Sequence, residues 1–425
     1  MANANAQSDG QQDRQMRRAQ RGLLALNFFM ADMQSGIGPF LGVFLLAHGW
    51  STGPIGSVLT LGGVAGMLMT APAGAFIDHT HRKRLVVVVT GSCTVLASCL
   101  VLVSQSGWVV ALSQVASAVA GAAIGPAVTG LTLGVVRQAG FIGQNGRNQM
   151  FNHAGNVLGA GLSGWLGWQF GMVAIFWLAA LFAVLSIVSV LSIPAAAIDH
   201  RAARGLEGNA ADDGDEGQAE GFRELLRNRP MLLLAVCLAC FHLGNGAMLP
   251  LYGMAVVSSR HADAAMFTAE TVMVAQGVMI VAAFVATRMA RRTGGYWLAL
   301  LVSFAVLPLR GVIAGHLITH WGVWPVQMLD GIAAGLQSVA VPGLVARLLD
   351  GTGRVNVGQG AVITVQNVGA SLSPALGGWL AQMLGYPRAF MLLGGFALIS
   401  VALWAGGASV LRRQGGRRAR GRALA

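Results

Sequence analysis

The sequence predicts an all-α membrane protein in which twelve transmembrane helices form two pseudo-symmetric bundles of six. Three observations support this fold class: a series of long apolar runs, a one-sided distribution of cationic residues and a weak internal repeat. The chain has 425 residues, of which 55% are hydrophobic and only 10% are charged. Soluble domains carry about 25% charged residues, so lipid rather than water is the expected surrounding of most side chains.

Twelve apolar runs are each long enough for a membrane-spanning helix, which requires about 20 apolar residues. An even number of crossings places both termini on the same side of the membrane. The runs lie near residues 22–47, 53–77, 85–104, 108–136, 148–169, 171–193, 231–256, 266–287, 295–318, 322–346, 356–384 and 389–411.

Nearly all cationic residues fall on one side of these predicted crossings. All but three of the 28 Lys and Arg residues lie on the side of the N-terminus; the exceptions are Arg260 and Arg388 on the opposite side and Arg310 within a run. Cytoplasmic loops are enriched in Lys and Arg. We therefore expect a multi-pass membrane protein with both termini cytoplasmic. The net charge of +12 then reflects topology and contact with anionic lipid, and no nucleic-acid partner is expected.

A polar segment divides the chain into two halves. Residues 194–229 are predicted to form a disordered cytoplasmic linker, because their acidic, Gly-rich part cannot bury an apolar core. The other predicted divisions are a cytoplasmic tail 1–21, an N-terminal bundle 22–193, a C-terminal bundle 230–411 and a basic cytoplasmic tail 412–425.

The two halves repeat each other weakly at an offset of about 210 residues. Phe28 aligns with Phe241, and this register places Asp32 opposite Asn245. Parallel repeats related by an axis along the membrane normal are common in transporters, whose sites lie at the interface of the repeats. The repeat therefore favours transport as the function.

The loop between the second and third crossings carries a family motif. It reads Gly-Ala-Phe-Ile-Asp-His-Thr-His-Arg-Lys-Arg over residues 74–84 and resembles the signature loop of the major facilitator superfamily, G-x-x-x-D-R/K-x-G-R-R/K, with His81 in place of the second Gly. The twelve crossings and the half repeat extend the resemblance over nearly the whole chain. The resemblance, which is to a bacterial branch of the superfamily, implies a secondary transporter of a bacterial inner (plasma) membrane that works by alternating access.

The loop is predicted to act as a conformational latch. A carboxylate near a helix N-terminus is stabilised by the positive end of the helix dipole, and such a contact can form in one access state and break in the other. The candidate latch residues are Gly74, Asp78, Arg82, Lys83 and Arg84.

Charged residues inside a membrane indicate function, because each costs about 2.5–3.5 kcal/mol on insertion scales. Asp32, Arg310 and Asp330 lie well inside the predicted crossings. Asp32 is predicted to be the main proton carrier, since a carboxylate in an alternating cavity can load and release a proton. Asp330 and His242 are the further candidates. Arg310 and Asp330 lie on successive helices and either pair with each other or leave Asp330 open to substrate or proton.

Uncharged polar residues in the runs are candidates for a substrate cavity, with helix–helix packing as the alternative for each. Asn148, Asn152 and Asn156 recur every four residues and so share one helix face. No catalytic set or metal-ligand spacing stands out, so no enzyme activity, metal or cofactor is predicted. The candidate cavity residues are Gln34, Asn152, Asn156, Asn245, Arg310, Gln337, Gln366 and Asn367.

The predicted function is proton-coupled transport of a small organic or amphipathic compound, with export as the leading direction. Drug–proton antiporters of the superfamily usually show R-x-x-Q-G in helix 4 and a Gly-Pro motif in helix 5. Here Ser117 stands at the Arg position and helix 5 lacks Pro, which weakens an assignment to drug efflux.

Import of a nutrient or iron chelate is the alternative function, and a non-transporting sensor or scaffold is the alternative of another class. The expected partners are the substrate, protons and the lipid bilayer, and the chain is predicted to act as a monomer.

Overall fold

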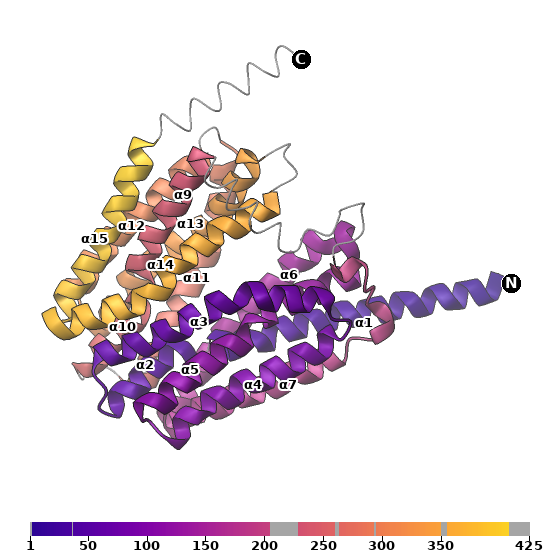
Figure 1. Ribbon diagram of the computed structural model, residues 1–425, viewed down its shortest axis with the longest axis horizontal. Helices are drawn as coiled ribbons and strands as arrows, with labels where there is room; N and C mark the ends of the chain where they lie inside the picture. Colours follow the sequence, from indigo (N-terminus) through magenta and orange to yellow (C-terminus); the bar gives the residue numbers. More distant parts are fainter. Residues whose placement is uncertain are drawn as a thin grey trace, which may run out of the picture. The chain divides into compact units, whose positions relative to one another are not determined.

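The computed structural model describes residues 2–35, 37–204, 228–259, 263–292, 295–349 and 355–407, and the regular structure of these residues is helical (Figure 1). Among them, nine helices are long and apolar enough to cross a membrane. The all-α membrane fold predicted from the sequence is thereby confirmed. The nine candidate spans are Thr52–Ile77, Lys83–Val103, Gly107–Arg137, Val173–Leu191, Arg229–Ser258, Ala264–Ala290, Gly295–His316, His320–Leu348 and Tyr386–Gly406.

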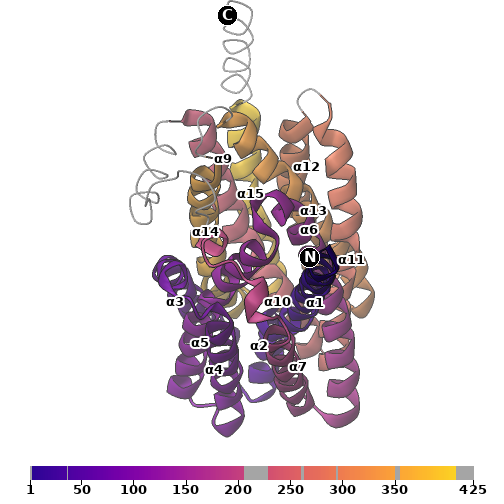
Figure 2. The same ribbon diagram turned by 90° about the vertical axis from the view of Figure 1, so that its right-hand side faces the viewer.

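The helices fall into two compact units. Unit 1 comprises residues 1–48, 61–213 and 263–273. Within it, α4 lies alongside α5 and α7 (Figure 1, Figure 2). Its elements are α1 (Ala2–Ser35), α2 (Ile37–Ala47), most of α3 (Thr52–His79), α4 (Lys83–Val103), α5 (Gly107–Ala122), α6 (Ile124–Phe170), α7 (Val173–Leu191) and the short 3-10 helices η1 (Ala195–Ala197) and η2 (Ala202–Arg204).

Unit 2 comprises residues 49–60, 214–262 and 274–425. Its elements are α9 (Arg229–Asn245), α10 (Met248–Ser258), most of α11 (Ala264–Ala290), α12 (Gly295–His316), η3 (His320–Gly322), α13 (Val323–Leu348), α14 (Val355–Leu384) and α15 (Tyr386–Gly406). The three predicted crossings outside the nine spans coincide with α1 and α2, with the second half of α6, and with α14.

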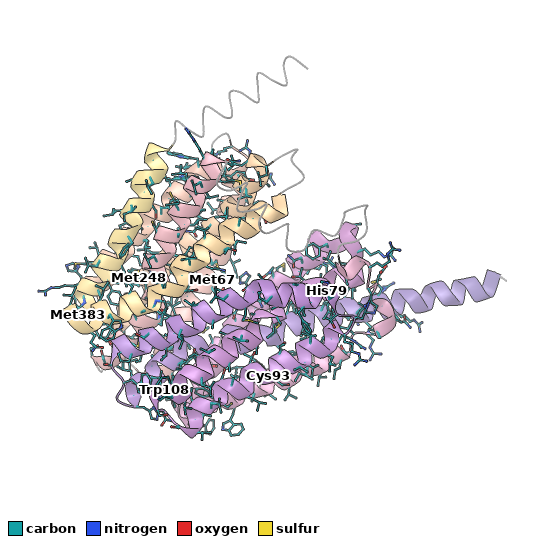
Figure 3. The ribbon with its side chains drawn as sticks, viewed as in Figure 1. Met67, His79, Cys93, Trp108, Met248 and Met383 are labelled. Atoms are coloured by element: carbon teal, nitrogen blue, oxygen red, sulfur yellow. The ribbon has the colours of Figure 1, made fainter. Side chains whose placement is uncertain are left out.

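Large apolar side chains point outward from the helices. Trp108, labelled in Figure 3, is 89% exposed, and Met383 is also exposed. A soluble protein rarely exposes many large apolar side chains in contiguous patches. Lipid is the medium in which such a surface is stable.

The contact of α1 with α6 and that of α9 with α14 are both extensive, and a glycine allows close approach of the helices in each. In unit 1, Gly155 of α6 lies against the backbone of Phe28 on α1, and in unit 2, Gly369 of α14 lies against the backbone of Ala239 on α9. A Cβ at either glycine would collide with a carbonyl oxygen of the partner helix. Small residues let helix backbones approach closely in lipid, so both contacts depend on glycine.

The first turns of α3 belong to unit 2, where they pack against α14. A Cβ at Gly56 would collide with the carbonyl group of Pro374, so the helices approach closely there too. Four hydrogen bonds of 2.9–3.0 Å join the two segments, and they pair Thr52 with Gly378, Gly53 with Gln382, Ser57 with Trp379 and Thr60 with Ala375.

The fourth predicted crossing comprises α5 and the first part of α6, and α6 continues past a break at Arg137 into the fifth. This residue has φ 57° and ψ 178° and is the one non-glycine residue with positive φ in the described part of the chain. That backbone region is essentially restricted to glycine, so neighbouring contacts must hold the turn. Arg137 Nη2 lies 3.0 Å from Oδ2 of Asp199, and Asp199 N donates to the Gly134 carbonyl at 2.8 Å. The segment after α7 therefore folds back onto α6.

Candidate functional site

A buried ion pair lies inside unit 2. Nη1 of Arg310 on α12 is 2.7 Å from Oδ1 of Asp330 on α13, and the two side chains are 1% and 14% exposed. A buried ion pair is stable only when further hydrogen bonds satisfy both partners. The surroundings of the two side chains therefore decide what the pair can do.

Hydrogen bonds from all three nitrogens hold the Arg310 side chain in place. Nη1 also donates to Asn245 Oδ1 on α9 at 2.6 Å, Nη2 donates to Gln327 Oε1 at 3.0 Å, and Nε donates to the Val326 carbonyl at 3.1 Å. Every guanidinium nitrogen thus has an acceptor. The position of this side chain is set by three helices at once.

The carboxylate of Asp330 is bonded through one oxygen. Oδ1 accepts from Arg310 and also from Asn245 Nδ2 at 3.2 Å. Within the described residues no donor reaches Oδ2. The cluster therefore holds a carboxylate in a fixed position with one oxygen available to a proton or a ligand.

A second, neutral layer lies one heptad away along the same helices. Ser303 precedes Arg310 by seven residues on α12, and Gln337 follows Asp330 by seven on α13, so each pair shares a helix face, about 10 Å apart at 1.5 Å per residue. Gln337 Nε2 donates to Ser303 Oγ at 2.7 Å, and Gln337 Oε1 lies 3.1 Å from Nε2 of His242 on α9. Since Gln337 Oε1 can only accept, His242 carries its proton on Nε2 in this arrangement.

A cavity of about 380 Å³ opens beside the neutral layer. Five polar side chains line it together with apolar residues, and none of the described lining residues is Asp, Glu, Lys or Arg. Three of the five were candidates from the sequence, whereas Ser338 and Gln359 were missed because nothing in an apolar run distinguishes a cavity face from a packing face. The polar lining residues are His242, Gln337, Ser338, Gln359 and Gln366.

The helix that carries Asn245 has a local irregularity next to the ion pair. The sequence predicts one run over 231–256, but α9 ends at Asn245 and α10 begins at Met248. Gly246 N donates to the His242 carbonyl at 2.9 Å, and Ala247 N donates to Ser373 Oγ on α14 at 2.8 Å. Gly246 and Ala247 keep helical φ and ψ angles, so α9 and α10 form one span, Arg229–Ser258, with a local irregularity beside the ion pair.

Unit 1 contains a neutral polar network on α6. The predicted face of Asn148, Asn152 and Asn156 is present there, but its members bond in two separate groups. In the first group the buried Asn148 accepts from Gln144 at 3.0 Å and donates to Thr132 Oγ1 at 3.1 Å; in the second, Asn152 accepts from Asn156 and donates to the Asn27 carbonyl of α1, both at 3.3 Å.

The basic residues of the predicted latch loop are anchored within unit 1. The Lys83 side chain is buried and its Nζ donates to the Ile77 carbonyl at the end of α3. Arg84 Nη1 donates to the Ile193 carbonyl after α7 at 2.7 Å, and Arg82 is exposed. The loop is therefore tied to α3 and α7 through cationic side chains.

Several predicted residues take no part in these contacts. Gly74 has open space where a Cβ would lie, with no atom within 4 Å, and Asn367 is half-buried on α14. The side chains of Asp32, Gln34 and Asp78 lie outside the described residues, so the roles expected for them stay predictions. Across the described residues, no group of three or more His, Cys, Asp or Glu side chains gathers to hold a metal ion.

Residues 23–356 match the family model of the Major Facilitator Superfamily. The chain belongs to this superfamily. Two uncharacterized MFS-type transporters of Mycobacterium tuberculosis, from two strains, are each 36% identical to it over 393 residues, which cover 91% of this chain and 93% of theirs. This superfamily member is therefore a multi-pass membrane transporter and not an enzyme, and the resemblance inferred from the loop motif is confirmed.

Solved transporter structures share the fold of this superfamily member. A variant of the nucleoside transporter NupG has a TM-score of 0.74 at 14% identity and covers 92% of this chain and 99% of its own. A POT family transporter in complex with 5-aminolevulinic acid has a TM-score of 0.69 at 10% identity and covers 93% and 96%. A bacterial homologue of the human lysosomal transporter Spinster has a TM-score of 0.66 at 13% identity and covers 92% and 96%. At these identities the likeness shows the fold alone.

Proposed function

We propose that this transporter couples proton movement to the export of a small organic or amphipathic compound, and that Asp330 takes part in the coupling. The observation that carries the proposal is the one-sided bonding of Asp330: Oδ1 is held by Arg310 and Asn245, while Oδ2 has no donor among the described residues. A carboxylate in this position is oriented and still open to a proton.

Protonation of Asp330 changes the charge balance of its ion pair with Arg310. With Asp330 ionised, Arg310 is paired; with Asp330 neutral, a cation that is 1% exposed has lost its counter-charge. An uncompensated buried charge costs several kcal/mol. Proton uptake at Asp330 therefore favours either a rearrangement of α12 and α13 or the arrival of an electronegative substrate group at Arg310. Both are ways to couple a proton to transport.

Asp32 is the second proposed proton carrier, on the basis of its position in the sequence. The repeat register sets it opposite Asn245, which contacts both members of the ion pair. His242, the third candidate, lies in the neutral layer with its Nε2 proton directed to Gln337.

The proposed substrate is neutral or weakly polar. The cavity beside His242 has about 380 Å³, within the range of about 300–1,000 Å³ for small-molecule sites. Its described lining offers amide and hydroxyl groups with apolar walls and no formal charge, which suits uncharged molecules with several hydrogen-bonding groups. Nucleosides, the substrates named for NupG, have this chemistry and belong in a test library.

The transporter is proposed to act as a monomer in a bacterial inner membrane with both termini cytoplasmic, as the distribution of Lys and Arg predicts. Import of a nutrient or iron chelate is the alternative direction. A sensor or scaffold without transport is the alternative from another class.

The experiment that tests the proposal is proton flux in proteoliposomes, screened against a library of neutral, amphipathic and chelate compounds. Asp330→Asn and Asp32→Asn are compared with wild type, and Asp199→Asn is the matched control because it makes the same change outside the membrane spans. Substrate-dependent proton flux that is lost in Asp330→Asn and kept in Asp199→Asn supports the proposal, and its sign separates export from import. If the flux is unchanged in Asp330→Asn, Asp32 or His242 would be the residue that couples proton movement to transport. No flux with any compound would favour the sensor.

A further inference from the structure

The side-chain amide of Gln337 belongs to a chain of hydrogen bonds that runs in one direction. Ser303 Oγ donates to the Ala333 carbonyl at 3.4 Å and accepts from Gln337 Nε2 at 2.7 Å. A carbonyl oxygen can only accept, so the Ser303 proton lies on the side of Ala333 and the amide nitrogen of Gln337 faces Ser303. The amide oxygen of Gln337 therefore faces away from Ser303, toward His242 on α9.

The direction of this chain decides which ring nitrogen of His242 carries the proton. Gln337 Oε1 lies 3.1 Å from His242 Nε2, and because an amide oxygen only accepts, Nε2 is protonated. The partner is a neutral amide and offers no counter-charge for a second proton, which would place an uncompensated charge within a membrane span at a cost in free energy. The ring is therefore neutral, and Nδ1 has a lone pair that no donor reaches within the described residues.

Two other histidines have the opposite tautomer. Nδ1 of His48 lies 2.8 Å from the Phe44 carbonyl, and Nδ1 of His316 lies 2.9 Å from the Val312 carbonyl, each four residues earlier on the same helix. Since these carbonyls only accept, Nδ1 is the protonated nitrogen in both rings. His242 differs because its hydrogen-bond partner is a side chain on another helix.

His242 lines the cavity of about 380 Å³ in unit 2, where a ligand can reach it. We propose that Nδ1 of His242 is a fixed hydrogen-bond acceptor for the transported compound, and that the cavity selects neutral molecules with an N–H or O–H donor. Ser303 and Gln337 are positioning residues, because they act through the tautomer of His242. The inference rests on the function proposed above, since it takes the transported compound to enter this cavity.

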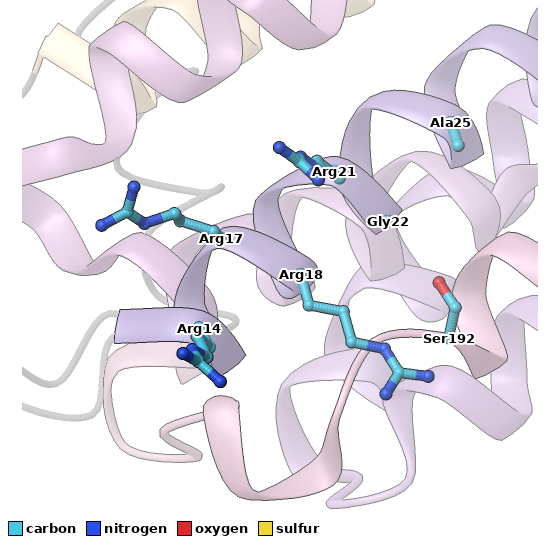
Figure 4. A pocket seen from close by; sticks show the side chains of 7 residues that line it. All are labelled: Arg14, Arg17, Arg18, Arg21, Gly22, Ala25 and Ser192. Carbon is cyan, nitrogen blue, oxygen red and sulfur yellow. The ribbon is translucent and has the colours of Figure 1, made fainter. Parts of the chain in front are cut away.

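A cavity of unit 1 presents donors instead. It has about 550 Å³, and the side chains that line it include Arg14, Arg17, Arg18, Arg21 and Ser192. The four guanidinium groups spread in different directions along α1 (Figure 4). A guanidinium group donates and cannot accept, so these side chains suit a ligand with acceptors. Arg18→Gln is therefore a control that changes a cavity lining without changing the acceptor on His242.

The first test measures the tautomer without a ligand. The full-length protein is labelled at its histidine ring nitrogens and studied by nitrogen NMR, with the His242 signals assigned by their loss in His242→Asn. We expect an unprotonated Nδ1 and a protonated Nε2 on His242, and the reverse pattern on His48 and His316. The three rings thus provide an internal comparison in one sample.

Two serine variants separate the positioning role from a general structural one. Ser303→Ala removes the hydroxyl that orients the Gln337 amide, and the His242 signals should become those of a mixture of tautomers. Ser338→Ala is the matched control, because Ser338 lines the same cavity but donates to the Gly335 carbonyl of its own helix at 2.8 Å. Its His242 signals should equal those of the wild type.

The second test measures binding with pairs of small neutral probes, in which one member has a donor and the other has that donor methylated. The pairs are uracil and its N,N′-dimethyl derivative, succinimide and N-methylsuccinimide, and phenol and anisole. We expect the donor members to shift the Nδ1 signal of His242 and to bind about tenfold more tightly than their methylated partners, the effect of one hydrogen bond. Ser303→Ala should reduce this preference, whereas Ser338→Ala and Arg18→Gln should preserve it.

Three results would overturn the proposal. A protonated Nδ1 on His242 in the wild-type protein would make the ring a donor toward the ligand. Donor probes that leave the His242 signals unchanged, or that bind no more tightly than their methylated partners, would remove the acceptor role. Identical His242 signals in Ser303→Ala and Ser338→Ala would show that the chain does not set the tautomer. None of these readouts measures proton movement, so a failure here is distinct from a failure of the coupling proposed for Asp330.

Discussion

The two units pack their helices alike but differ in the polar groups that they bury. Gly155 in unit 1 and Gly369 in unit 2 bring two helices together against a backbone carbonyl. The polar network around Asn148 is neutral, whereas Arg310 and Asp330 form an ion pair. The close helix contact is a matter of shape and occurs in both units, whereas the buried charge is a matter of chemistry, in which the described parts of the two units differ. When a neutral side chain is removed, its hydrogen-bond partner remains as an unpaired polar group. When a charged side chain is removed, its partner remains as an unpaired ion, so the two units should respond differently to substitution.

Breaking the ion pair should have the largest effect. Arg310→Met leaves the Asp330 carboxylate in its buried site without a counter-charge, and we expect a loss of about 3–5 kcal/mol in unfolding free energy, together with loss of transport. Denaturant unfolding in detergent measures the first and proteoliposome flux the second. Arg310→Met/Asp330→Leu removes both charges and should recover most of the stability without recovering transport. A double variant as unstable as the single one would contradict this account.

Substitution of the two packing glycines should have equal and intermediate effects. Gly155→Leu and Gly369→Leu each force a side chain against a backbone carbonyl, and overpacking of this kind costs about 1–3 kcal/mol. The unfolding free energies of the two variants give the comparison directly. Gly360→Leu is the matched control, because no atom lies within 4 Å of a Cβ built there. A large effect at one glycine only would show that the two helix contacts are not equivalent.

The neutral network of unit 1 should tolerate substitution better. Asn148→Ala removes hydrogen bonds to Thr132 and Gln144, and the expected loss is about 1 kcal/mol, because no ion is left behind. Unfolding of Asn148→Ala beside Arg310→Met tests the difference between the units. The comparison fails if Asn148→Ala destabilises as much as Arg310→Met.

The smallest effect should be a pH dependence at Asp199. Hydrogen bonds from the backbone N–H groups of Ala202 and Arg201, together with the charge of Arg137, hold the pKa of this carboxyl below its usual value. Its contribution to stability is therefore complete above the pKa of an unfolded Asp and is lost as the pH falls through the lowered pKa. The unfolding temperature of wild type minus that of Asp199→Asn should shrink over this acidic range. A difference that does not change with pH would assign Asp199 no such role.

The sequence predicted the fold well because lipid imposes simple constraints on it. Length, hydropathy and the placement of Lys and Arg all derive from the bilayer, and each can be recognised without tertiary contacts. The break at Arg137 and the local irregularity after Asn245 could not be predicted in this way. Both depend on distant partners, Asp199 for the first and Ser373 for the second.

Part of the candidate site could be predicted, most directly where charge singled out a residue; the neutral candidates Asn245, His242 and Gln337 lie in it as well. Arg310 and Asp330 were identified because charges are rare in apolar runs, and the structure brings them together. Gln327, Ser303 and Gln359 were not, since neutral polar side chains are frequent in membrane helices and their direction depends on how the helices pack.

The pairing of Arg310 with Asp330 also has an electrical consequence. A cation and an anion held 2.7 Å apart sum to zero, so a movement that carries the pair through the membrane field does no electrical work. A single elementary charge crossing the whole field exchanges about 2.3 kcal/mol per 100 mV. With a proton on Asp330, the cluster would carry one net positive charge, and the membrane potential would drive or oppose its movement. Under the proposed proton coupling, the ion pair would therefore separate a voltage-insensitive step of the cycle from a voltage-sensitive one.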